Sequence, residues 1–106
     1  MNANQLMSAV EHFRQLDPEM PSQMVLCFLI VAENPGITLT KLGERAGIVA
    51  SSVTRNIYSL SRIKSKGISG HDLVDVELNP ESRREKLVSL SAKGKRFYGT
   101  LMALIS

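Results

Sequence analysis

The segment from Thr38 to Leu60, TLTKLGERAGIVASSVTRNIYSL, constrains the fold more than any other, because two amphipathic stripes flank a short glycine-containing turn. The first stripe lies on LTKLGERA, with Thr38 as its predicted N-cap and Gly47 at its end. The second stripe has the spacing of one helical face and consists of Val53, Ile57 and Leu60. Ile63 or Lys64 can continue this stripe, which predicts a second helix that continues to about Ser65. Two helices joined by such a turn form a helix-turn-helix.

Further elements are predicted on both sides of this motif. Apolar residues at helical spacing predict a first helix over residues 4–16, and the almost wholly apolar SQMVLCFLIVAE predicts a central, buried second helix. LVDVEL and KLVSLS alternate apolar and polar residues, so they predict an antiparallel hairpin with NPESRR as its long, basic tip. KGISGH is a loop by composition. Ser91 is the predicted N-cap of a last helix over residues 92–105.

These elements describe a mainly α fold with a small β-hairpin (α+β), namely a winged helix-turn-helix with flanking N- and C-terminal helices. We expect a single domain over residues 1–106, with the helix-turn-helix at about 38–65 and the wing at about 72–91. The core of a domain of 106 residues is limited, and pairing with a second copy is one way to bury more surface.

Positive charge is concentrated in the second part of the chain. Up to Thr40 one base faces four acids, whereas from Lys41 to Arg96 twelve bases face six acids. This is expected of a domain with one face toward a polyanion, although solvated surface lysines alone give the same pattern. No apolar run approaches the roughly 18 residues that span a bilayer, and the N-terminus lacks the features of a secretory signal. We therefore expect a cytoplasmic protein with no membrane partner.

Enzymatic signatures are absent from the sequence, which has no Gly-rich phosphate loop, nucleophile elbow or paired metal ligands. We expect neither catalysis nor a metal or cofactor. Cys27 lies in an apolar run, where a cysteine usually behaves as a small hydrophobe. A role as a peroxide sensor would require a lowered thiol pKa, which its apolar neighbours oppose.

The spans NPGITLTKLGERAGIVASSVTRNIYSL and LVDVELNPESRREKLVSLSAKGKRF resemble the MarR-type family of winged helix-turn-helix transcription regulators. The resemblance covers about residues 25–97. It is most specific in RREKLVSLSAKGKRF, which is similar to the family's wing return strand and the start of its next helix. It implies a dimer held by its terminal helices, a recognition helix in the DNA major groove and a wing along the adjacent minor groove.

The residue types on the predicted recognition helix favour the same contacts. Short side chains let its backbone come close to the major groove, and these are Ala50, Ser51, Ser52 and Thr54. Arg55 is the long residue among them and can read a base or a phosphate; alternatively, it is a solvated residue with a local acidic partner. Thr38 and Thr40 can bind phosphates at the start of the preceding helix, although Thr38 can also act only as a cap.

The wing departs from the family pattern at one position. Arg84 stands where the family carries the arginine of an Asp-x-Arg motif, so the resemblance implies a minor-groove contact for it. Ser82 replaces the Asp, which indicates a more mobile or differently aimed wing. Arg83 and Lys86 are either phosphate contacts or solubilising charges. A second departure is the insertion SRIKSKGISGHD, which adds Arg62 as a further predicted DNA contact.

Two functions stay open. The first is sequence-specific binding of double-stranded DNA by a transcription regulator that acts as a repressor. The second is a winged helix that binds another DNA-handling protein without reading DNA, since a fold does not fix its partner. The terminal helices are short for the family, and their apolar stripes either pair between copies or close a monomer's core. A symmetric homodimer is our prediction, and no small-molecule effector can be inferred.

Overall fold

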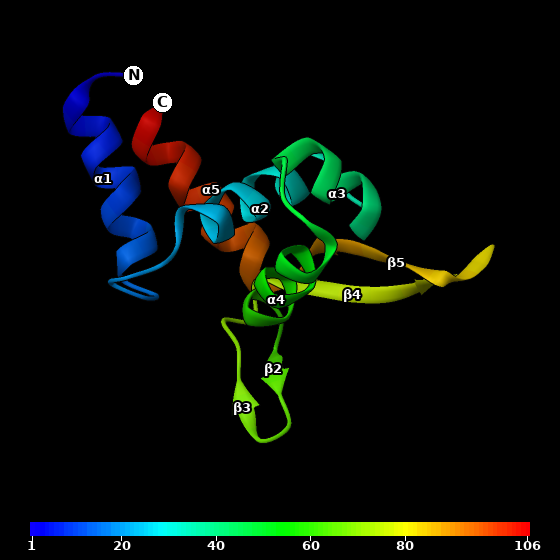
Figure 1. Ribbon diagram of the computed structural model, residues 1–106. Helices are drawn as coiled ribbons and strands as arrows, with labels where there is room; N and C mark the ends of the chain where they lie inside the picture. Colours follow the sequence, from blue (N-terminus) through cyan, green and yellow to red (C-terminus); the bar gives the residue numbers. More distant parts are fainter.

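Helices form the body of the molecule, and two β-hairpins project from it (Figure 1). The computed structural model describes residues 1–106. The helices are α1 (Ala3–Arg14), α2 (Ser22–Glu33), α3 (Leu39–Ala46), α4 (Ala50–Leu60) and α5 (Ala92–Ile105). The strands are β1 (Ile37–Thr38), β2 (Ile63–Ser65), β3 (Ile68–Ser69), β4 (Val74–Asn79) and β5 (Ser82–Leu90). None of the helices is long and apolar enough to cross a membrane.

Local capping interactions set the helix ends that the sequence predicts. The Thr38 hydroxyl accepts the Lys41 N–H at 3.1 Å at the start of α3, and Gly47 ends this helix with a left-handed φ of 69°. The Ser91 hydroxyl accepts the Gly94 N–H at 2.9 Å at the start of α5. In α1, Asn2 forms a capping box with the residue three positions on, and the helix covers Ala3–Arg14 rather than residues 4–16.

The predicted antiparallel hairpin is confirmed and joins a third strand. The sheet order is β1-β5-β4, so the return strand β5 lies in the middle. Val88 is the Cα partner of both Ile37 and Val76, and its side chain is completely buried. The short strand β1, directly before α3, therefore ties the helix-turn-helix to the base of the wing.

The core lies between α2, the helix-turn-helix and the base of the sheet. Its fully buried members include Phe28, Val31, Leu42, Ile57, Leu60, Leu73 and Val88. The prediction of a buried α2 holds along one face only, because Leu26 on this helix is 42% exposed. An aromatic cluster of Phe13, Phe28 and Phe97 joins α1 and α5 to this core, with ring centroids 5.2 to 5.8 Å apart.

The prediction that the recognition helix continues to about Ser65 is wrong, because α4 ends at Leu60. Ser61 is extended, with φ −79° and ψ 178°. Its hydroxyl group is within donating distance of two carbonyl oxygens, those of Tyr58 (2.8 Å) and Ile63 (3.0 Å). A serine that bonds to neighbouring carbonyls in this way competes with a further helical turn.

The prediction of a loop at KGISGH is also wrong in part. Ile68–Ser69 pairs with Ile63–Ser65 as the short antiparallel β2–β3 hairpin. Its base is closed by long-range backbone pairing, in which the Leu73 N–H donates to the Leu60 carbonyl at 2.7 Å. This pairing has no local sequence signal, which explains why periodicity alone extended the helix.

The tip of the wing is shorter than predicted. Asn79 pairs with Ser82, so the turn consists of Pro80 and Glu81, and Arg83 and Arg84 belong to strand β5. The basic residues that the sequence placed at the tip therefore lie along the side of the wing.

Two alanine substitutions in α5 provide a matched test of this packing. A Cβ at Gly94 would overlap the carbonyl group of Leu73, whereas one at Gly99 would have no atom within 4 Å. We expect Gly94→Ala to lower the free energy of unfolding by about 1–3 kcal/mol through overpacking. Gly99→Ala should raise it by about 0.5–1 kcal/mol, because alanine favours a helix. Urea unfolding measures both, and changes of the same sign would contradict the packing.

Candidate nucleic-acid interface

Helices α3 and α4 approach each other closely at Gly43, which is buried. A Cβ at this position would lie 3.0 Å from Val53 Cγ2 and 3.2 Å from the Ile48 carbonyl oxygen. A larger residue would therefore move one helix relative to the other. This contact fixes the angle at which α3 presents α4 to solvent.

The outer face of α4 carries small polar side chains, as the sequence predicts. Ala50, Ser51, Thr54 and Arg55 are exposed and Ser52 is half-buried, whereas Val53, Ile57 and Leu60 face the core. The Arg55 guanidinium is 3.4 Å from the Ser52 hydroxyl, a weak hydrogen bond at most. The single ion pair of the chain joins Arg14 to Glu11, so no carboxylate pairs with Arg55. The guanidinium is free to bind a ligand.

Three elements of the predicted interface meet around one hollow of about 240 Å³. It is lined by Leu39 and Thr40 of α3, Thr54 and Tyr58 of α4, and Arg84, Glu85 and Lys86 of β5. Four of the predicted DNA contacts therefore lie together, namely Thr40, Thr54, Arg84 and Lys86. These side chains come from both the helix-turn-helix and the wing, so one ligand in the hollow could contact both.

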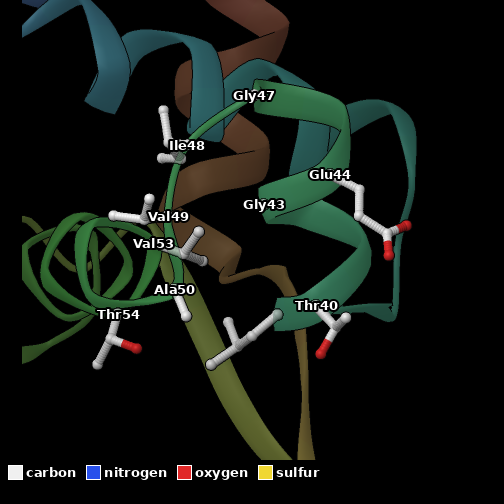
Figure 2. Close-up of a pocket in the computed structure, with 10 residues that line it drawn as sticks. Thr40, Gly43, Glu44, Gly47, Ile48, Val49, Ala50, Val53 and Thr54 are labelled. Carbon is white, nitrogen blue, oxygen red and sulfur yellow. The ribbon is translucent and has the colours of Figure 1, made fainter.

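A larger cleft of about 480 Å³ adjoins this hollow and separates α3 from the start of α4 (Figure 2). Figure 2 shows Thr40 and Glu44 on the α3 side and Thr54 on the α4 side. Val49 also lines it and is 68% exposed just before α4 begins. Val49 is not among the predicted contacts, although its place between Gly47 and the start of α4 is a sequence signal for exposure.

A contact between α4 and the wing was also missed. The Lys86 ammonium donates to the Tyr58 hydroxyl at 2.6 Å and lies 5.3 Å from the centre of the tyrosine ring. This bond tethers β5 to the last turn of α4. Tyr58 comes three residues after Arg55 and therefore lies on the same side of the helix. An aromatic residue at this position is the one sequence feature that could have indicated a contact with the wing.

The wing turn is stabilised by the side chain of Asn79, the last residue of β4. The Asn79 side-chain oxygen accepts the Glu81 N–H at 3.0 Å, and its amide group is 3.4 Å from a Glu85 carboxylate oxygen. Leu78 pairs with Lys86 and Asn79 pairs with Ser82, so the intervening residues 83–85 have no cross-strand partner. This bulge leaves Arg83 and Arg84 exposed on one strand.

The other predicted residues lie apart from the hollow. Thr38 is half-buried, and its hydroxyl serves as the α3 cap. Arg62 is exposed at the start of the β2–β3 hairpin. Cys27 is fully buried, and burial raises the pKa of its thiol, which opposes the thiolate that a peroxide sensor needs. The role of each predicted residue in DNA binding stays a prediction.

Tyr58→Phe tests the tether between α4 and the wing. It removes the hydroxyl that accepts from Lys86 but keeps the ring, so the free energy of unfolding should fall by no more than about 1.5 kcal/mol. Backbone amides of β5 should exchange with deuterium faster, as followed by mass spectrometry. Tyr98→Phe, on α5, is the matched control and should leave wing exchange unchanged. Equal exchange rates in the Tyr58→Phe and wild-type wings would show that the tether is not formed.

Sequence comparisons identify no relative, since no protein-family model and no curated protein matches the chain. Solved structures do match it. The PcaV transcriptional regulator from Streptomyces coelicolor has a TM-score of 0.69 and 20% identity over 95% of this chain and 69% of its own. MarR has a TM-score of 0.68 and 17% identity over 98% of this chain and 75% of its own.

A third similar structure contains DNA. In the complex of S. aureus MepR with DNA, the protein has a TM-score of 0.72 and 12% identity over 90% of this chain and 70% of its own. At such identities a likeness is evidence of fold alone. These likenesses cover most of the chain, which has a MarR-type winged helix-turn-helix fold.

Proposed function

We propose that this protein binds double-stranded DNA in a sequence-specific manner and regulates transcription, with α4 as its recognition helix. The observation that carries the proposal is the free Arg55 guanidinium on a helix face of small residues. An α-helix is about 10–12 Å across, and the major groove is about 12 Å wide. Small residues beside Arg55 let the α4 backbone approach the bases while the arginine reaches a guanine edge.

The wing supplies the second contact of the proposed complex. It projects away from the helical body (Figure 1), and Arg83 and Arg84 are exposed along β5. Arginine is drawn to narrow minor grooves by their negative potential. Arg84 of the wing lines the same hollow as Thr40 and Thr54 of the helix-turn-helix. A backbone phosphate between the two grooves is the ligand that suits this position.

Support also comes from the proteins that share the fold. PcaV is described as a transcriptional regulator, and MepR has been solved bound to DNA. We propose that this chain likewise regulates transcription, and that it acts as a repressor by occupying promoter DNA.

Arg55→Ala is the decisive variant for this proposal. Wild-type protein should bind a labelled duplex with an affinity that falls steeply with salt, measured by fluorescence anisotropy. On a selected operator, Arg55→Ala should weaken binding at least about tenfold, as expected for the loss of an arginine–guanine contact. Arg14→Ala is the control, because Arg14 lies on α1 and is paired with Glu11. Wild type that fails to bind any duplex at low salt would refute DNA binding.

We further propose a homodimer formed through the terminal helices. Helices α1 and α5 pack together at the end of the molecule away from the wing (Figure 1). Their outer surface exposes Leu6 (52%), Met7 (61%), Val10 (51%) and Leu104 (36%). Covering this surface with a second copy would remove apolar area from water and place two α4 helices on one duplex.

Charge introduced on α1 tests the dimer. Leu6→Glu combined with Val10→Glu should give a monomer by sedimentation equilibrium at concentrations where wild type is a dimer. The control, Asn4→Glu with Ser8→Glu, places the same charges with the same spacing on exposed polar positions of α1. It should remain dimeric. A wild type that sediments as a monomer at every concentration would contradict the proposal.

A further inference from the structure

The β2–β3 hairpin is an arm attached to the end of the recognition helix. It leaves the chain directly after α4 and returns before β4, and it projects from the body in a direction different from the wing (Figure 1). Every residue from Arg62 to Ser69 is exposed. The hairpin therefore adds nothing to the core, which a purely structural element would do.

The base of this arm is fixed to α4 by backbone hydrogen bonds. The N–H groups of Gly70 and His71 donate to the carbonyls of Arg62 and Ser59, each at 3.0 Å. The Asp72 N–H donates to the Ser61 carbonyl at 3.1 Å. A Cβ at Gly70 would overlap the Ser61 carbonyl oxygen, so the two segments are in close contact. The arm must accompany α4 wherever the helix binds.

The cations of the arm form no ion pair. They are Arg62, Lys64 and Lys66, and residues 61–71 contain no acidic side chain. Lys93 of α5 adds a fourth cation at the base, where its ammonium donates to the His71 carbonyl at 2.9 Å. Ile63 and Ile68 are each 55% exposed, but three cations without an ion-pair partner beside two apolar side chains favour a polyanion over a protein partner.

The dimensions of α4 place the arm near the DNA backbone. The helix has 11 residues and is therefore about 16 Å long, more than the roughly 12 Å width of the major groove. In a helix-turn-helix complex the N-terminal residues of the recognition helix contact the bases. Its C-terminal end then lies at a phosphate ridge, and there the chain continues into Arg62.

We propose that the β2–β3 hairpin is a second wing, whose cations bind phosphates of the duplex that flank the bases read by α4. The inference rests on the proposed function and adds to it a contact element outside the helix-turn-helix and the β4–β5 wing. Phosphate contacts of this kind raise affinity for all sequences and release counterions, so they leave a signature in the salt dependence of binding.

The test compares two double variants of equal net charge. Lys64→Gln with Lys66→Gln removes two cations of the arm, and Arg14→Gln with Lys95→Gln removes two cations of α1 and α5. Fluorescence anisotropy on operator and non-specific duplexes at several salt concentrations gives the slope of log affinity against log salt. We expect the arm variant to reduce the magnitude of the slope by about 2 per bound protomer, and so by about 4 for the proposed dimer, at about 0.9 per contact and equally for both duplexes. The control should keep the wild-type slope.

The same titrations separate this inference from the proposed function. If wild type binds and Arg55→Ala weakens it, but the arm variant keeps the wild-type slope, the second wing is refuted and DNA binding stands. If wild type binds no duplex, both fail. A loss of slope in the control variant as large as that in the arm variant would also overturn the inference, because the effect would then reflect net charge alone. Thermal unfolding of both variants verifies that they are folded.

Discussion

Four segments of the chain meet at the backbone of Leu73, and the arrangement of the binding elements depends on this junction. The Leu73 N–H donates to Leu60 at the end of α4, and its carbonyl accepts from Ser91 at the start of α5. Gly94 packs against the same carbonyl, and the side chain of Leu73 is completely buried. Since β4 begins at the next residue, one buried residue connects α4, both hairpins and α5.

This dependence explains which parts of the fold could be predicted from sequence. Signals that act over three or four residues were sufficient for the Thr38 cap, the Gly47 stop and the Ser91 cap, because each is complete within one turn of helix. The end of α4 was mispredicted, since it depends on the hydrogen bonds of Ser61 and on the pairing of Leu60 with Leu73. Apolar spacing that continued to Ile63 imitated a longer helix, yet that residue is exposed on a strand.

The candidate site also has features that the sequence predicts and features that it does not. Local composition was enough to single out the small residues of α4 and the arginine among them, because both lie on one helical face. It could not reveal the bond between Tyr58 and Lys86, which are 28 positions apart, or the bulge that exposes Arg83 and Arg84. The Asn79 side chain organises the wing turn, so replacing the family's Asp with Ser82 does not leave that turn without side-chain hydrogen bonds.

The tether from Lys86 to Tyr58 has a consequence for how DNA would be discriminated. A wing bonded to the last turn of α4 would have to pull on this helix, or break the bond, in order to adjust to the width of the minor groove. Sequences with an unsuitable groove width would therefore be penalised twice, at the wing and in the fit of α4 to the bases. Direct and indirect readout would then be energetically coupled, and substitutions at base pairs under the helix and under the wing should have non-additive effects on affinity.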